Sequence, residues 1–201
     1  MNNIALELAY RAHMNQKRKG SEIPYIIHPL EVAVILIANK ADEDTINAGI
    51  LHDTIEDTTV DIDEIREKLG DKVAELVLAA SEPYKINAKV KLSDCEEIES
   101  WKERKIHTIN YVKTASRQVQ LLTLSDKLSN LRSLIVDYQR IGNKLWKKFN
   151  APCSEQKWYY ESLVNSFISL NDIDMYKEFK EKVKILFESK EVFDYINDEN
   201  A

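Results

Sequence analysis

The sequence predicts an all-α protein of one domain, and three observations support this prediction. Leucine, isoleucine, lysine and glutamate recur at helical spacing along most of the chain. Only four glycines and four prolines occur in 201 residues, and these residue types usually interrupt helices. A hydrophobic content of 44% in a chain of this length is sufficient for one sizeable core. We therefore expect a single domain over residues 1–201, with about ten helices and no linker or internal repeat.

Caps and breakers place the individual helices. Pro29 fits the first turn of a helix that runs to about Asn39. Asp42 or Asp44 can cap the next helix, which carries residues 52–57 and closes at residues 59–61. We also expect helices over residues 5–19, 62–69, 71–80, 116–137, 154–170 and 173–190, a helix that opens at Trp101 after an acidic run, a loop over residues 81–93 and a frayed end over residues 197–201.

The composition excludes several classes of protein. A net charge of −6 argues against nucleic-acid binding through bulk electrostatics. Cys95 and Cys153 are far apart and form no CxxC, so neither a zinc finger nor a disulfide framework is indicated. No apolar stretch approaches 18 residues and no secretory leader is recognisable, which predicts a cytoplasmic protein without a membrane span. The glycines are too scattered for a phosphate-binding loop, so a bound phosphate must be held by metal, Lys, Arg or helix N-termini.

One short segment concentrates the chemistry. His52, Asp53, Glu56 and Asp57 occupy six positions within a predicted helix, where residues three and four apart share a face. Three carboxylates on one buried stripe repel one another unless a cation is shared among them. The segment is therefore either a solvated acidic face or a divalent-metal site with a spare carboxylate pair.

Two distant residues favour the metal site. His28 precedes Pro29 at the start of a predicted helix, and Asp126 lies on the long helix predicted over residues 116–137. Together with His52 and Asp53 they give the order H…HD…D, which resembles the HD superfamily of metal-dependent phosphohydrolases. The fuller pattern comprises Arg18-Lys19-Gly20, Pro24-Tyr25, His28-Pro29, His52-Asp53-x-x-Glu56-Asp57 and Asp126-Lys127-Leu-x-Asn130-Leu-Arg132.

That pattern is similar to the RelA/SpoT-type (p)ppGpp hydrolases in their stand-alone form, the small alarmone hydrolases. The resemblance is close over residues 5–136, and we expect the aromatic-rich helices of residues 138–196 to pack on that part. It implies a helical HD-domain fold around one metal ion, with the ligands His28, His52, Asp53 and Asp126. A mixed imidazole and carboxylate set without thiolate suits Mn²⁺, the ion expected from the resemblance, with Fe²⁺ and Zn²⁺ as alternatives.

The resemblance also implies an activity and roles for further residues. The expected reaction is hydrolysis of the 3′-pyrophosphate of ppGpp or pppGpp, giving GDP or GTP and pyrophosphate. Glu56 and Asp57, beside the metal, would orient the attacking water and protonate the leaving oxygen. Arg18 and Lys19 are candidates for gripping the anionic substrate, and Asn130 is placed at the pocket. Arg104 and Lys105 either face the substrate phosphates or belong to an ordinary helix start, and the sequence favours neither.

Two other functions stay open at this point. The same chemistry could act on another substrate, such as a nucleotide monophosphate or a phosphorylated dinucleotide cofactor. A non-catalytic, nucleotide-sensing HD domain is a different class, but it would be expected to lose a metal ligand or the Glu56-Asp57 pair, and this chain keeps both. The expected partner is a small nucleotide, with no nucleic acid and no membrane, and the sequence does not determine the oligomeric state.

Overall fold

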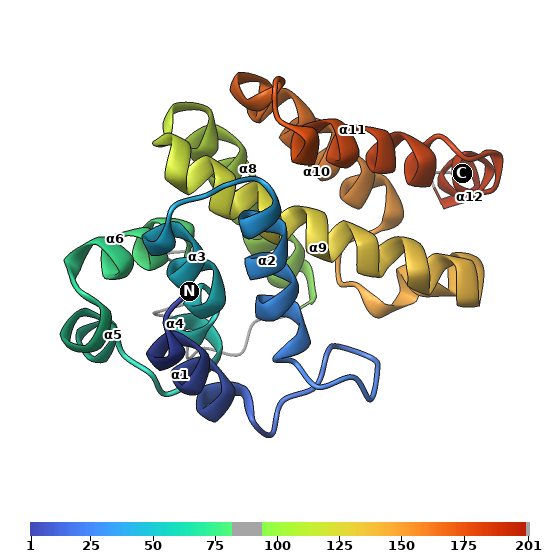
Figure 1. Ribbon diagram of the computed structural model, residues 1–201. Coiled ribbons are helices and arrows are strands. Elements are labelled where there is room, and N and C mark those ends of the chain that lie inside the picture. The colour runs from blue at the N-terminus through green and yellow to red at the C-terminus, as the bar shows by residue number, and fades with distance from the viewer. Residues whose placement is uncertain (82–93, 200–201) are drawn as a thin grey trace. The chain divides into compact units, whose positions relative to one another are not determined.

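The computed structural model describes residues 1–81 and 94–199, without the side chains of residues 94–98 (Figure 1). These residues are helical apart from turns and one isolated antiparallel bridge between Lys17 and Pro24. The prediction of an all-α fold is confirmed. The described residues group into two compact units, which are treated separately here, and the expectation of one domain stays a prediction.

The first unit comprises Met1–Ala88 and Ala115–Ser129. The helix α3 lies against α1, α2 and α6, and α5 packs against α6. The leucines predicted for one side of α9, such as Leu124 and Leu128, are fully buried. Its helices are α1 (Asn3–His13), α2 (Ile27–Ala38), α3 (Glu43–Leu51), α4 (Thr54–Asp57), α5 (Ile62–Leu69), α6 (Asp71–Ala80) and the first part of α9 (Arg117–Ile141).

Helices α2 and α3 pack closely against each other at Gly49, and this packing positions His28 and His52. A Cβ at Gly49 would lie 2.5 Å from Leu36 Cδ1 and 3.3 Å from Val32 Cγ1, so a larger residue would force the buried Leu36 side chain to move. Asp42 caps α3 by accepting a hydrogen bond from the Thr45 amide at 2.9 Å, as the sequence predicted. The helices run antiparallel, which brings the first turn of α2 beside the end of α3.

The second unit comprises Lys89–Thr114 and Asn130–Ala201. Aromatic rings pair throughout it: Trp146 stacks on Phe187 with centroids 5.8 Å apart, and Phe167 meets Phe179 edge-on at 6.4 Å. Arg132 forms two 2.8 Å hydrogen bonds with Glu178. Its elements are α8 (Asp94–Thr114), the rest of α9, the 3₁₀ segments η1 (Gly142–Lys148) and η2 (Ile168–Leu170), α10 (Cys153–Ser166), α11 (Asp174–Phe187) and α12 (Lys190–Glu199).

Several predicted boundaries were wrong. The first helix ends at His13 and not at residue 19, because the polar residues after it form a turn in which the Tyr25 amide bonds to the Gln16 carbonyl at 2.9 Å. The helix expected to open at Trp101 begins at Asp94, so the acidic run lies inside its first turns, where the helix dipole favours anions. The expected frayed end is helical in α12 as far as Glu199. The loop predicted over residues 81–93 lies outside the described residues except for Ser81.

The helices of residues 1–81 and 94–199 were compared with the length and hydropathy of membrane-spanning helices. None of them combines the length and the hydropathy that crossing a bilayer requires.

Candidate metal centre

Two histidines meet where α2 begins and α3 ends. His28 is the second residue of α2, and Pro29 follows it in the first turn, where a missing amide proton costs nothing. His52 follows directly after α3. The antiparallel packing of the two helices brings the imidazole rings to a centroid distance of 5.2 Å, and both residues are buried.

The segment that carries His52 and Asp53 is not the continuous helix that the sequence predicted. The chain turns at these two residues, and α4 restarts at Thr54, whose hydroxyl donates to the Leu51 carbonyl at 2.6 Å. On an unbroken helix, adjacent side chains diverge by about 100°. The turn removes this divergence, because His52 Nε2 lies 3.1 Å from Asp53 Oδ2.

Asp126 completes the group from α9. Its Oδ1 lies 3.2 Å from His28 Nε2 and 3.7 Å from His52 Nε2. His28 Nε2 also lies 3.5 Å from Asp53 Oδ2. The four residues predicted as metal ligands therefore lie together, and ligand atoms of His28, His52 and Asp126 fall within 4.8 Å of one another. Asp126 is 9% exposed, and its carboxylate faces the two imidazoles.

Hydrogen bonds on the far side of each ring orient both imidazoles. His28 Nδ1 lies 2.9 Å from Ser129 Oγ, and the Ser129 hydroxyl donates onward to Glu31 Oε2 at 2.8 Å. His52 Nδ1 donates to the Gly49 carbonyl at 2.8 Å. In the neutral rings, both Nδ1 atoms then carry the proton and both Nε2 lone pairs point into the group, as in metal-binding histidines.

The charges in the group depend on one another. Burial lowers the pKa of His52, but the facing carboxylates of Asp53 and Asp126 outweigh burial and raise it well above its ordinary value. Burial raises the pKa of Asp53, yet the neighbouring imidazole of His52 holds it below its usual range. Burial likewise opposes ionisation of Asp126, and the ammonium of Lys127 lowers its pKa well below the usual value. The site thus favours carboxylates in their charged form, which is the form that binds a cation.

The residues present fit a bound divalent metal. His52 Nε2 is buried and makes no hydrogen bond of acceptable geometry with any described residue. An orphaned buried nitrogen is costly unless a further group binds it. Two imidazole nitrogens and two carboxylates, without a thiolate, suit Mn²⁺, Fe²⁺ or Zn²⁺, and this donor set does not choose among them.

The acidic pair predicted for proton transfer lies on α4, directly after the proposed ligands His52 and Asp53. Glu56 and Asp57 form the last turn of α4, where Glu56 is half-buried and Asp57 exposed. Asp57 is tied to the loop after α1, because Gln16 Nε2 donates to its carbonyl at 2.6 Å. The Tyr25 hydroxyl reaches Asp57 Oδ2 at 3.5 Å and Asp53 Oδ2 at 2.6 Å.

The predicted substrate-binding residues fall into two groups. Arg18 and Lys19 lie in the loop of the first unit, and the Arg18 guanidinium carbon sits 5.7 Å from the centroid of the Tyr25 ring. Asn130, Arg104 and Lys105 belong to the second unit, so their position relative to the metal group stays a prediction.

The surroundings of these second-unit residues are clear on their own helices. Asn130 follows Asp126 by one turn of α9. Lys105 Nζ lies 5.2 Å from the centroid of the Tyr159 ring, and Arg104 donates to Ser100 Oγ at 2.6 Å. The contact of Lys105 with an aromatic ring is a packing role that the sequence did not indicate.

Other residues at the centre were not predicted from the sequence. Lys127 donates to Asp126 Oδ2 at 2.6 Å and so neutralises the outer oxygen of that carboxylate. Ser129 and Glu31 orient His28, and Tyr25 contacts Asp53. Lys127 and Tyr25 stand within the motifs that carry the family resemblance, which is the signal that could have drawn attention to them.

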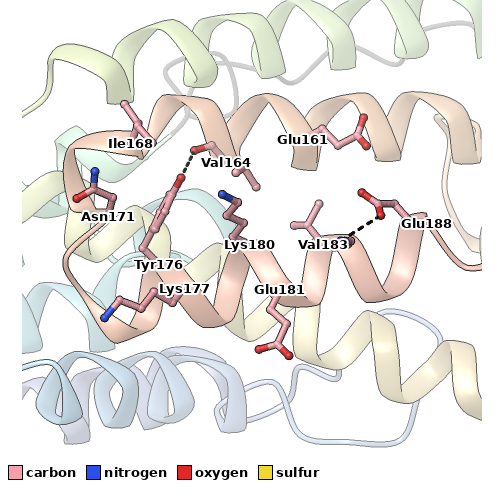
Figure 2. Close-up of a pocket in the computed structure, with 11 residues that line it drawn as sticks. Glu161, Val164, Ile168, Asn171, Tyr176, Lys177, Lys180, Glu181, Val183 and Glu188 are labelled. Atoms are coloured by element: carbon pink, nitrogen blue, oxygen red, sulfur yellow. Dashed lines mark hydrogen bonds and ion pairs between the residues drawn. The ribbon is translucent and has the colours of Figure 1, made fainter.

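A pocket of about 680 Å³ lies in the second unit between α10 and α11 (Figure 2). Figure 2 shows Tyr176, whose hydroxyl donates to the Val164 carbonyl at 3.2 Å, beside Lys180 on the wall of the pocket. Its lining alternates aliphatic residues with Lys and Glu, and none of its residues was predicted for the site. The pocket holds no cluster of imidazoles and carboxylates, so the metal group is the better candidate for chemistry.

Comparison with known families agrees with this helical fold and its His-Asp group. The HD domain model matches residues 5–151, and the chain belongs to this family. It is related to the hydrolase domains of the RelA/SpoT proteins, which confirms the resemblance inferred from the motifs.

Two named proteins illustrate which members of the family this chain is similar to. The chain is 39% identical over 144 residues to a protein of Aquifex aeolicus named guanosine-3′,5′-bis(diphosphate) 3′-pyrophosphohydrolase, covering 72% of this chain and 19% of that protein. It is 39% identical over 125 residues to a GTP pyrophosphokinase of Myxococcus xanthus, covering 62% of this chain and 16% of the other. The chain thus spans less than a fifth of the length of these relatives.

Solved structures of similar size also match. The structure of lmo0812 from Listeria monocytogenes EGD-e aligns with a TM-score of 0.69 at 33% identity, covering 81% of this chain and 99% of that one. A metazoan protein described as an ortholog of SpoT that hydrolyses ppGpp aligns with a TM-score of 0.67 at 24% identity, covering 94% and 95%. The second likeness concerns the fold alone.

Proposed function

We propose that this chain is a metal-dependent phosphohydrolase that removes the 3′-pyrophosphate of ppGpp or pppGpp. Water is consumed, the ester bond to the 3′ oxygen is cleaved, and the products are GDP or GTP and pyrophosphate. The observation that carries the proposal is the group of His28, His52, Asp53 and Asp126, with both Nε2 atoms directed inward. The named activity of the Aquifex relative supports the choice of substrate.

The metal supplies one part of the chemistry: when bound, a divalent ion lowers the pKa of water and polarises the phosphoryl oxygens. The chain supplies the rest. His28 and His52 hold the ion through Nε2, because their Nδ1 protons are engaged by Ser129 and by the Gly49 carbonyl. Asp53 and Asp126 add the negative charge that a divalent cation requires.

Proton transfer is assigned to the acidic pair. Glu56 and Asp57 follow the proposed ligand Asp53 by about one turn, and this proximity in the chain supports a role in proton transfer to and from the reacting groups. One carboxylate would accept a proton from the water, and the other would give a proton to the leaving oxygen. Arg18, with Lys19 beside it, would grip the pyrophosphate, since a guanidinium can bind two oxygens at once.

Three further candidates for substrate binding lie in the second unit, and the family resemblance alone supports them. Asn130 would contact the nucleotide from α9, and Arg104 and Lys105 would either contact the phosphates or serve only the packing of α8. We assign Mn²⁺ as the expected ion, with Fe²⁺ and Zn²⁺ as alternatives.

A substrate panel tests the proposal. Chelator-stripped protein is supplied with Mn²⁺ and then with ppGpp, pppGpp, nucleotide monophosphates or a phosphorylated dinucleotide cofactor. We expect pyrophosphate release from ppGpp and pppGpp only, and none before Mn²⁺ is added. Orthophosphate release from monophosphates, with ppGpp left intact, would replace this proposal by a different phosphohydrolase of the same family. Binding of ppGpp without any turnover would indicate a sensing domain.

A further inference from the structure

Tyr25 occupies the short distance between the metal group and the loop that carries Arg18. It lies just before α2 in the loop that follows α1. Its hydroxyl donates to Asp53 Oδ2 at 2.6 Å, which is the short distance typical of a charge-assisted bond to a carboxylate. Tyr25 is therefore connected directly to one of the four proposed ligands.

The Tyr25 ring contacts other residues of the first unit. The Arg18 guanidinium lies 5.7 Å from the ring centroid, within the range of a cation–π contact. The His13 ring lies 4.8 Å away, and His28 meets the ring at 5.9 Å in an edge-on arrangement. The ring thus lies in the space between α1, the loop and the start of α2.

The loop itself is anchored independently of the Tyr25 side chain. His13 Nδ1 and Gln16 Oε1 are 2.7 Å apart, and Gln16 Nε2 donates to the Asp57 carbonyl at 2.6 Å. The Tyr25 amide donates to the Gln16 carbonyl at 2.9 Å. Because the backbone is held by these bonds, removal of the Tyr25 hydroxyl alone leaves the loop in place.

Asp53 is the ligand whose orientation most needs such a bond. It stands at the turn between α3 and α4 and makes no side-chain capping bond to α4. A carboxylate in this position can rotate about its terminal torsion unless a partner fixes one oxygen. The Tyr25 hydroxyl bonds to Oδ2, the Asp53 oxygen that faces both imidazoles. Hydrogen-bond partners of metal ligands typically change metal affinity or activity by about 10- to 100-fold.

We propose that Tyr25 is a positioning residue with two separable contributions, in which its hydroxyl orients the Asp53 carboxylate toward the imidazoles and its ring supports the Arg18 guanidinium. The first contribution sets metal affinity and the second sets the grip on an anionic substrate. The inference rests on the proposed metal-dependent hydrolase, and its first part needs the metal alone.

Three variants separate the two contributions. Tyr25→Phe removes the hydroxyl and keeps the ring, whereas Tyr25→Leu removes both. Tyr10→Phe is the matched control, because Tyr10 lies on α1 and is 58% exposed. The dissociation constant for Mn²⁺ is measured by the paramagnetic resonance signal of free Mn²⁺, without substrate, and the melting temperature of the metal-free proteins reports whether each variant folds.

Tyr25→Phe and Tyr25→Leu should both weaken Mn²⁺ binding by about 10- to 100-fold, with Tyr10→Phe unchanged. At saturating Mn²⁺, Tyr25→Phe should keep the KM for ppGpp, and Tyr25→Leu should raise it by about 2- to 30-fold through loss of the cation–π contact. If Tyr25→Phe binds Mn²⁺ as tightly as the wild type, the hydroxyl has no positioning role. If the two variants share one KM, the ring has none.

Failure of the proposed function would look different. A wild-type protein that binds Mn²⁺ but does not hydrolyse ppGpp removes the proposed function, while the loss of Mn²⁺ affinity in Tyr25→Phe still tests the hydroxyl. The ring is then tested by calorimetric binding of ppGpp to the same three variants. A wild-type protein that binds no Mn²⁺ removes the metal site and this inference together.

Discussion

The two units of this protein bury different kinds of side chain. In the first unit, His28, His52, Asp53 and Asp126 lie together with little exposure, and His52 Nε2 has no hydrogen-bond partner among the described residues. In the second unit, the core combines aliphatic side chains with aromatic rings that contact one another. The aromatic packing stabilises by burial alone, whereas the buried charges of the first unit destabilise it until a cation is shared. The difference indicates that the first unit carries the chemistry.

Removal of a metal ligand should have the largest effect. Asp53→Ala should abolish activity and the stabilisation by Mn²⁺, which for the wild type is about 2.7 kcal/mol at a hundredfold excess over Kd, or roughly 5–10 °C in Tm. Release of pyrophosphate measures the activity, and calorimetric melting with and without Mn²⁺ measures the stabilisation. Asp63→Ala, at an exposed position of α5, should keep the full shift. A full Mn²⁺-dependent shift in Asp53→Ala would remove Asp53 from the ligand set.

Charge removal at the acidic pair should separate chemistry from metal binding within the first unit. Glu56→Gln and Asp57→Asn keep the side-chain size and should lower kcat by about 10² to 10⁴ through loss of proton transfer. Metal content, measured by elemental analysis, should be retained. Glu67→Gln on the exposed part of α5 is the control. Near-normal kcat in both variants would make the pair a solvated acidic face.

Truncation of a buried aromatic side chain in the second unit should lower stability without changing metal binding. Phe179 is fully buried and contacts the Phe167 and Tyr160 rings. Phe179→Ala should therefore lower the free energy of unfolding by about 3–5 kcal/mol, while Mn²⁺ affinity stays unchanged. Denaturant titration gives the stability, and Phe193→Ala, at a 58% exposed position, should cost far less. Loss of Mn²⁺ affinity in Phe179→Ala would contradict the proposed division between the units.

Substrate grip should be sensitive to the shape of the cation and not only to its charge. Charge-assisted hydrogen bonds contribute about 1.5–3 kcal/mol, so Arg18→Lys should lower kcat/KM for ppGpp by roughly 10- to 150-fold. The loss on a small artificial phosphodiester should be much smaller. Arg11→Lys, which alters the exposed pair with Glu64, is the control. Equal losses on both substrates would assign Arg18 to the fold or to the metal site.

The surface ion pair of the second unit should have the smallest effect. A hydrogen bond from Arg132 holds the pKa of Glu178 below its usual value. A lowered pKa means that the pair stabilises the fold above the ordinary pKa of about 4.3 and loses this contribution as pH falls. Because both side chains are 34% exposed, Glu178→Gln should cost no more than about 1 kcal/mol at pH 7. The difference from wild type, followed by denaturant titration, should shrink as the pH falls below about 4.3; a difference that does not depend on pH would assign it to packing.

The sequence was informative where local pattern decides the structure. The cap at Asp42, the break at Gly70 and the buried leucines of α9 follow from residue type and spacing, and the structure agrees. The proposed ligands were identified by motif order, and the structure brings them together. For the cap, the break and the leucines the signal lies within one helix or its ends, and for the ligands it lies in the order of the motifs.

The failures share a physical cause, because they depend on specific side-chain contacts, some local and some between distant parts of the chain. The break after Leu51 follows from the Thr54 hydroxyl and from the packing around Gly49, which helical periodicity cannot detect. The roles of Ser129 and Tyr25 depend on partners on other elements.

The hydrogen bond between His28 and Ser129 joins residues that are 101 positions apart in the chain. A contact of this span requires closure of a long loop, so we expect it to form late in folding. Interactions that are absent from the folding transition state slow unfolding and leave the folding rate nearly unchanged. Bound metal would then extend the lifetime of the native state without accelerating its formation, and the loaded protein would resist proteolysis for longer than its equilibrium stability alone suggests.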